Sequence, residues 1–447
     1  MSNQSKYALS EKNMAIAKEI FPEGKLSSAD MKKVPLFYAK AKGSKVYDID
    51  GNEYIDYFLG NGPLILGHCH DEVVSAIKEQ AEKGINFGGH SEISLKFAQK
   101  ICDSVKSIER MRYTSTGTEA TYYAIRIARA YTKRDYILRF EGAYHGHHNL
   151  ALMSSKMKHA SIDLLKKYPI PDTRPYVDSA GIPNDEADKV FIAPFNNIER
   201  LEEILEKHGD KIACVMVEPV QRYIEPKDDF LKKVRELTKK YGILMILMFF
   251  DEIVTGFRLA PGGAQQYYGV DADITALGKI TGGGFPHGVI GGPKEIMDKV
   301  FDPTSDQYVF HAGTFSGNAI ACAAGYTQVS VLERDDLYER LHYLGKKIRE
   351  GIREVLNKTG LPYRVYGVGP MWHFSFIDKD IIDYRSSLFA NKSLADKIVT
   401  KMYDKGVLCS LGRNYISAVH SDEDIDKTIE IFEESVKETL REEKKNV

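Results

Sequence analysis

The sequence predicts an α/β protein, in which buried strands alternate with helices. Three stretches support this fold class. The apolar run from Ile243 to Phe250 has the length and composition of a strand buried on both faces, and it ends at Asp251. A second apolar segment, Ile274 to Leu277, ends at Gly278-Lys279 and a glycine cluster. A third, Met111 to Thr114, runs through a glycine-containing turn into a helical pattern.

Composition and charge favour an enzyme over a nucleic-acid or membrane protein. The 447 residues suffice for one large domain with one or two smaller ones, and a net charge of -2 implies no polyanionic partner. No apolar run of membrane-spanning length occurs, and the first residues contain no signal-peptide core. The five cysteines are scattered and never spaced as CxxC, which suits a reducing compartment. We therefore expect a cytoplasmic protein.

Further elements follow from periodicity and turn residues. Apolar stripes predict helices near 8–21, 71–83, 228–241, 333–357, 392–405 and 421–440, and strands are expected at 136–140, 212–217 and 371–377. Alternation around Asp50-Gly51 predicts a hairpin over 45–58. Residues 151–190 are rich in proline and weakly periodic, so we expect an excursion over the surface there.

The acid and the lysine at the ends of two buried strands indicate a catalytic site. A lysine such as Lys279 can form a Schiff base with a carbonyl cofactor or substrate. An aspartate such as Asp251 can hold a pyridinium proton, the usual partner of pyridoxal phosphate (PLP). The alternative, that Lys279 is an ordinary surface lysine after a strand, is the default for a lysine taken alone.

These segments resemble the class III (subgroup II) PLP-dependent aminotransferases, in particular the glutamate-1-semialdehyde aminomutases and the β-amino-acid transaminases. The resemblance runs from about residue 35 to the last helix. It implies fold type I, with a large domain built on a mainly parallel sheet with helices on both faces, and a smaller α+β domain. The implied division is an N-terminal segment of the small domain (1–70), the PLP-binding domain (71–325) and the C-terminal small domain (326–447).

The resemblance also implies a cofactor site. PLP would be held as a Schiff base on Lys279, and Asp251 would pair with its ring nitrogen. The strand–turn–helix segment at 115–118 has the geometry of an anion site, because it points free N–H groups at a ligand. The family places the phosphate cup there, on Thr116, Gly117 and Thr118. Taken alone, the same residues are an ordinary helix start.

Three further positions match family segments around the cofactor. Tyr144 would stack on the pyridine face. Glu218 would lie beside the cofactor and could orient the site by a hydrogen bond, but a purely structural hydrogen bond is an equally good interpretation of this residue. Thr314 matches the threonine that reaches the phosphate of the neighbouring subunit, which implies a homodimer with composite sites.

A metal site is the competing hypothesis for the histidines of this region. His145, His147 and His148 cluster after a strand, with His68 and His70 upstream. They lack the i, i+4 register of a helical metal motif, and no acidic ligand set accompanies them. We therefore predict no metal.

The substrate prediction depends on residues 411–415. The aminomutases carry a glutamate on the corresponding loop, whereas this chain is shorter there and has Arg413. In the resembling β-amino-acid transaminases an arginine at this point binds the substrate carboxylate, a task that suits a guanidinium fork. A solvent-exposed loop arginine is the alternative.

We therefore expect a transaminase that moves an amino group from a β-amino acid or related amine to 2-oxoglutarate or pyruvate. The rivals are the intramolecular glutamate-1-semialdehyde aminomutase, a PLP-dependent amino-acid racemase and a non-enzymatic PLP-fold binding protein. CoA-thioester amines are not excluded as substrates.

Overall fold

A computed structural model describes residues 5–26, 36–155, 174–241, 246–334 and 336–445. Its central element is a seven-stranded sheet with the order β4-β10-β9-β8-β7-β5-β6. In chain order these strands are β4 (Arg110–Thr114), β5 (Tyr136–Phe140), β6 (Val190–Ala193), β7 (Ile212–Val217), β8 (Leu247–Asp251), β9 (Ile274–Gly278) and β10 (Gly288–Gly292). Strands β6, β5, β7, β8 and β9 are parallel, and only β10 runs antiparallel to its two neighbours. The mainly parallel sheet is as expected.

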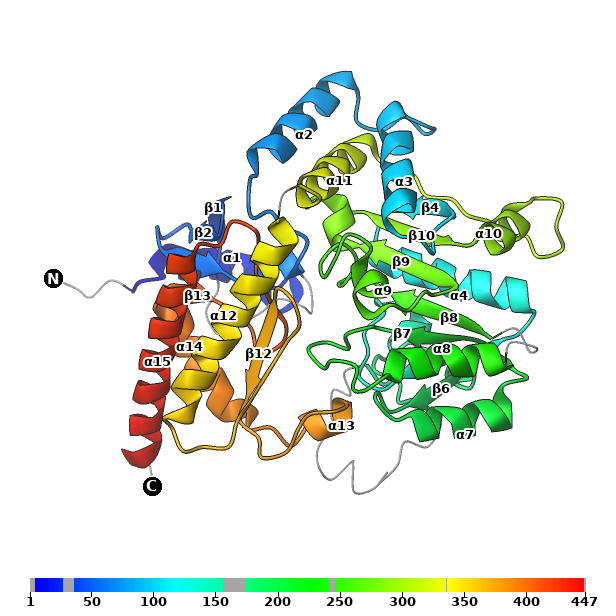
Figure 1. Ribbon diagram of the computed structural model, residues 1–447. Coiled ribbons are helices and arrows are strands. Elements are labelled where there is room, and N and C mark those ends of the chain that lie inside the picture. The colour runs from blue at the N-terminus through cyan, green and yellow to red at the C-terminus, as the bar shows by residue number, and fades with distance from the viewer. Residues whose placement is uncertain (1–4, 27–35, 156–173, 242–245, 335, 446–447) are drawn as a thin grey trace.

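Helices cover both faces of this sheet, as Figure 1 shows. Leu247 and Phe249 point to one face, where they pack in a cluster with apolar residues of α4 (Gly117–Thr132) and α10 (Lys294–Phe301). Met248 and Phe250 point to the other face and pack with α7 (Ile198–His208) and α8 (Phe230–Lys240). This alternation explains why the strand is apolar throughout, since each face meets its own core.

The two ends of the chain build a second part, on the left of Figure 1. The N-terminal strands β1 (Tyr38–Lys42), β2 (Lys45–Asp48) and β3 (Glu53–Asp56) form a sheet with β13 (Val407–Leu408), so segments from both ends share one sheet. A third sheet contains β11 (Arg364–Tyr366), β12 (Met371–Ser375) and β14 (Asn414–Tyr415). This second part of the molecule also contains four helices, α1 (Ala8–Ile20), α12 (Leu337–Asn357), α14 (Lys392–Asp404) and α15 (Asp422–Lys445). This arrangement supports the proposed domain division, whose boundaries stay a prediction.

The remaining helices are α2 (Asp71–Lys83), α3 (Glu92–Ser104), α6 (Asn184–Ala187), α9 (Gly263–Tyr268), α11 (Ala319–Leu332) and α13 (Tyr384–Ser387). Helix α2 has the bounds that the sequence predicts, whereas the other five of these helices were not predicted. Strand β8 begins at Leu247, and the predicted strand residues 243–245 lie outside the described part of the chain. Of the described helices, none is both long and apolar enough to cross a membrane.

Candidate active site

Four neighbouring parallel strands end at one edge of the central sheet, and each brings a polar residue there. Strand β8 ends at Asp251, β9 is followed by Lys279, and β7 by Glu218. Strand β5 is followed by a loop that carries Tyr144 and His145. Because parallel strands place their carboxyl ends at the same edge, the topology gathers these groups, and ligands of open α/β sheets bind at such an edge.

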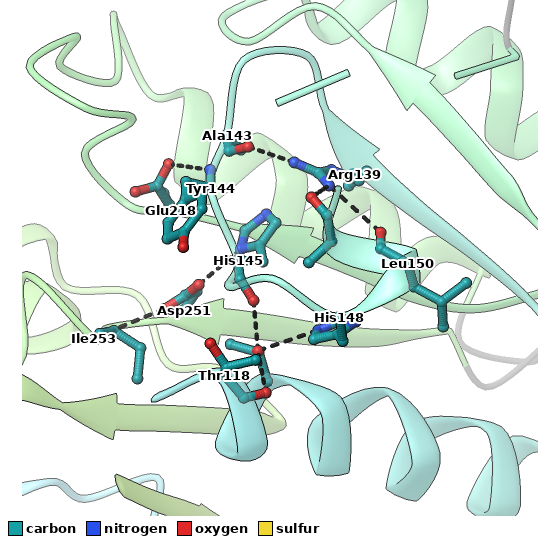
Figure 2. Close-up of polar contacts among 12 residues, drawn as sticks. Thr118, Arg139, Ala143, Tyr144, His145, His148, Leu150, Glu218, Asp251 and Ile253 are labelled. Carbon is teal, nitrogen blue, oxygen red and sulfur yellow. Dashed lines mark hydrogen bonds and ion pairs between the residues drawn. The ribbon is translucent and has the colours of Figure 1, made fainter. Parts of the chain in front are cut away.

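Asp251 is a buried acid of this edge, with 5% of its surface exposed. Its Oδ1 accepts a hydrogen bond from the backbone N–H of Ile253 at 3.1 Å, and its Oδ2 lies 2.7 Å from His145 Nδ1 (Figure 2). Burial raises the pKa of Asp251 to about 7, because the ionised form loses its hydration. A positive partner, such as a pyridinium, would restore the ionised form.

His145 is a site residue that the sequence suggested only as a metal-ligand candidate. Burial, and after it the charge of Arg139, lowers its pKa to about 3, so the ring is neutral at ordinary pH. We assign the single ring proton to Nδ1, which donates to Asp251, and His145 Nε2 has no partner among the described residues. This hydrogen bond favours the ionised carboxylate. The adjacent Tyr144 is the only local signal that could have identified the residue.

Arg139 holds the loop that carries Tyr144 and His145. Its guanidinium is fully buried in β5 and donates to the main-chain oxygens of Ala143, Leu150 and Ala151 (Figure 2). These are bonds to neutral acceptors, so the cation contributes charge as well as geometry to the edge.

Lys279 begins the short 3-10 turn Lys279–Gly282 with a φ of 48°, in the left-handed region that non-glycine residues seldom adopt. Burial, followed by the positive charges of Arg413 and Arg258, lowers the pKa of Lys279 to about 8. The neutral amine is therefore far more abundant near neutral pH than it is for an ordinary lysine. A neutral amine is the form that attacks a carbonyl carbon.

The predicted phosphate cup lies at the start of α4. Thr116 caps the helix, because its side chain accepts the N–H of Glu119 at 3.2 Å, and Thr118 Oγ1 lies 3.1 Å from His147 Nδ1. The backbone N–H groups of Gly117 and Thr118 have no partner among the described residues, as expected of a first helical turn. A Cβ on Gly117 would lie 2.8 Å from Ile253 Cδ1, so this turn packs close to the residues that follow Asp251.

Glu218 joins the aromatic loop to the predicted substrate arginine. Its Oε2 accepts the N–H of Tyr144 at 2.9 Å, and its Oε1 lies 3.2 Å from Nη1 of Arg413. The ion pair is largely enclosed, with 5% and 11% of the two side chains exposed. Tyr144 is 37% exposed as a residue, which leaves room for a flat ligand beside it. Arg413 is therefore not a solvated loop arginine.

Thr314 is not in contact with this edge. Its side chain is exposed, and its backbone oxygen accepts a hydrogen bond from Asn86 at 3.0 Å. Exposed apolar side chains lie close in sequence to both residues of this bond. They are Phe310 and Phe315 near Thr314, and Ile85 and Phe87 on either side of Asn86.

The clustered histidines have partners other than a metal. His145 contacts Asp251, His147 contacts Thr118, and His148 Nε2 lies 3.3 Å from the hydroxyl of Thr121. In the described ranges, no group of three or more histidine, cysteine or acidic side chains is arranged to hold a metal ion.

The residues of this edge fit PLP. Asp251 offers an acid to the ring nitrogen, Lys279 an amine to the carbonyl carbon, and Gly117 and Thr118 two N–H groups to the phosphate. His145 Nε2 is a buried polar atom without a hydrogen-bond partner in the described part of the chain, which leaves it available to a ligand.

Comparisons with known proteins identify the family of the chain. The family description "Aminotransferase class-III" matches residues 26–436. A glutamate-1-semialdehyde 2,1-aminomutase from Persephonella marina is 43% identical over 91% of this chain and 92% of its own length. A crystal structure of an omega-transaminase from Sphaerobacter thermophilus superposes with a TM-score of 0.88 and 30% identity, over 96% of this chain and 98% of that one. A transaminase solved with PLP bound is 27% identical, with a TM-score of 0.85, over 97% and 99% of the two chains.

Proposed function

This chain belongs to the class-III aminotransferases, which are PLP-dependent enzymes, and we propose that it is a glutamate-1-semialdehyde 2,1-aminomutase. The observation that carries the proposal is the 43% identity to the Persephonella marina aminomutase over 91% of the chain. From the sequence we expected a β-amino-acid transaminase first and gave the aminomutase as an alternative. The curated relatives support the aminomutase better.

The residues of the edge have separate tasks in this proposal. Bound PLP supplies an electron sink for a substrate carbon that loses a proton. Lys279 Nζ removes and returns that proton, since its lowered pKa leaves the amine available as a base. Asp251, which also accepts a hydrogen bond from His145, would hold a proton on the ring nitrogen, whose positive charge favours the ionised carboxylate. Tyr144 and the loop around it exclude water from one face.

Arg413 is the group that we propose for the substrate carboxylate. The semialdehyde carries its carboxylate at the end remote from the reacting carbons, and Arg413 belongs to the C-terminal part of the chain rather than to the central sheet. The guanidinium is paired with Glu218. An incoming carboxylate would replace Glu218 as the partner, so the buried cation need not be left unpaired.

One observation favours intermolecular transamination as a second candidate. Residues 411–415 contain no acid, whereas the resembling aminomutases have a glutamate on this loop, and Arg413 stands in the site instead. The 30% identical omega-transaminase with a TM-score of 0.88 adds support. In this case a β-amino acid or related amine would donate to a 2-oxo acid.

Dependence on an acceptor separates the two candidates. The aminomutase should convert glutamate-1-semialdehyde to 5-aminolevulinate without any 2-oxo acid. A transaminase should give glutamate or alanine only when 2-oxoglutarate or pyruvate is added with a β-amino donor. Conversion of the semialdehyde at no more than the uncatalysed rate, together with acceptor-dependent turnover, would overturn the proposal in favour of the transaminase.

Arg413→Gln tests the carboxylate site in the same assays. We expect KM to rise by about tenfold to a hundredfold, because a charge-assisted fork contributes about 1.5–3 kcal/mol. The matched control is Arg235→Gln, which removes a comparable arginine from its fork on Asp273 at the opposite edge of the sheet. An unchanged KM in Arg413→Gln would remove this arginine from the substrate site.

We also propose that two copies of the chain form the active unit, with Thr314 directed toward the partner's phosphate site. The exposed apolar side chains Phe310 and Phe315 beside it support an interface at this surface. Sedimentation of the purified protein tests the dimer, and a monomer at assay concentrations would contradict it.

A further inference from the structure

A buried ion pair connects the C-terminal part of the chain to the loop that carries Tyr144. Arg385 belongs to α13, which in Figure 1 lies below the gap between the two parts of the molecule. Its Nε donates to Glu141 Oε2 at 2.7 Å and its Nη2 to Glu141 Oε1 at 3.1 Å. The side chains are 12% and 2% exposed, and two parallel bonds fix the carboxylate in the guanidinium plane.

The segment around Arg385 is docked on the central sheet by more than this pair. Ile377 and Ile381 are buried in the same apolar cluster as Phe140, the last residue of β5. The backbone oxygen of Ile382 accepts a hydrogen bond from Asn196 at 2.8 Å, after the end of β6. The segment that carries Arg385 is therefore held against the central sheet by apolar packing and by a backbone hydrogen bond as well as by the ion pair.

Tyr384 also restricts the backbone beside Glu141. Gly142 has a φ of 84°, and a Cβ there would lie 2.4 Å from Tyr384 Cβ, so α13 touches the loop backbone directly. The backbone oxygen of Gly142 accepts a bond from Arg222 Nε at 3.1 Å. Residue 142 is thus held from both sides.

Glu141 is only three residues before Tyr144. Consecutive Cα atoms lie about 3.8 Å apart, so this short stretch couples a shift of Glu141 to the hydrogen bonds of the next residues. Those bonds are Tyr144 N–H to Glu218 and His145 Nδ1 to Asp251. Both belong to the candidate active site.

We propose that Arg385 is a positioning residue of the active site, which acts across the domains through Glu141 to fix the loop of Tyr144 and His145. The inference rests on the cofactor site proposed above, and it is independent of which substrate the enzyme uses. Arg413 belongs to the same C-terminal part, so one part of the chain both contacts the substrate and supports the cofactor loop.

The test compares Arg385→Gln with Arg235→Gln, which breaks a similar fork of 2.5 and 2.7 Å to Asp273 far from the loop. Each change leaves a largely enclosed carboxylate without its arginine, so both variants should unfold at a lower temperature. Amide hydrogen exchange of residues 141–145 in the PLP-free protein and spectrophotometric titration with PLP then report on the loop. These measurements need no substrate.

We expect Arg385→Gln alone to speed exchange in 141–145 and to weaken PLP binding by about tenfold or more, as remote misplacement of a site can. Arg385→Lys, which keeps the charge but not the fork, should restore part of both. If Arg385→Gln does not fold, Arg385→Lys and Glu141→Gln provide the same comparison. Exchange and PLP affinity that match those of Arg235→Gln would overturn the inference. A failed substrate assay with these two readouts as expected would affect only the proposed function.

Discussion

The sheet edge at Asp251 and the segment at Thr314 are both predicted parts of one cofactor site, and the chain builds them differently. Asp251 is buried and held by His145 and Ile253, whereas the Thr314 side chain is exposed beside the exposed Phe310 and Phe315. The groups proposed for proton transfer are thus fixed within one chain. The group proposed for the neighbouring phosphate is left on an apolar surface, where a second copy would complete it.

The largest effect should come from the enclosed half of this comparison. Lys279→Ala removes both the cofactor attachment and the proposed base, so turnover should fall by about 10⁴-fold or more. Steady-state rates and the absorbance of bound PLP measure the two losses separately. Turnover within tenfold of the unmodified enzyme would show that the enclosed edge is not the reaction centre.

Asp251→Ala should cost somewhat less and should separate catalysis from binding. Without the carboxylate the ring nitrogen loses its proton, so we expect a fall in turnover of about 10²–10³-fold with PLP still bound. His145→Phe removes only the hydrogen bond to Asp251 and serves as the graded control. Equal losses of turnover and PLP affinity in Asp251→Ala would mean that the acid mainly holds the cofactor.

Thr314→Ala tests the exposed half. One lost hydrogen bond to a charged phosphate should weaken PLP binding by about tenfold while the rate at saturating PLP changes little. The effect should vanish if the protein is diluted until it dissociates, because the proposed contact crosses the interface. A Thr314→Ala effect that persists in separated chains would place this residue in its own chain's site.

The smallest effect concerns pH and the stability of the PLP-free protein. The pKa of Lys279 is lowered to about 8 in the folded state from about 10.5 in the unfolded chain, so folding disfavours the charged amine. This penalty is complete below pH 8 and disappears as the pH rises to 10.5. Lys279→Met should therefore melt higher than the unmodified protein at pH 7, on the order of 1–3 °C.

Melting curves between pH 7 and pH 10.5 measure this difference, which should shrink as the pH rises. Arg110→Met, at an exposed arginine of β4, is a control for charge removal at the surface. A difference that is constant over this range would mean that Lys279 is not desolvated.

The sequence was most informative where a polar residue of the candidate site directly follows a buried strand. Asp251 and Lys279 each follow an apolar run, so their placement at one edge could be predicted. Helix α11 was missed because most of its sides are buried, which removes the amphipathic stripe by which a helix is recognised. Helix α15 extends beyond the predicted end through charged residues that pair with α14, as Glu442 does with Lys401.

Contacts between distant segments could not be predicted from local patterns. Glu218 and Arg413, or Glu141 and Arg385, are paired only because the C-terminal part folds back against the central sheet. His145 was hidden for another reason, since a histidine among histidines suggests a metal until its neighbour across the sheet edge is known.

The short strands on either side of Arg413 suggest where the enzyme can be altered by mutation. β13 and β14 are two residues long each, and β14 pairs with β12 through only two residues. Both strands lie outside the seven-stranded sheet, so residues of the connection between them can be exchanged without shifting the register of that sheet. Residues 409–412 are therefore the part of the connection to vary first, because a change at Arg413 would also reach Glu218 and the charge around Lys279. Libraries restricted to this connection are the economical starting point for redirecting the enzyme.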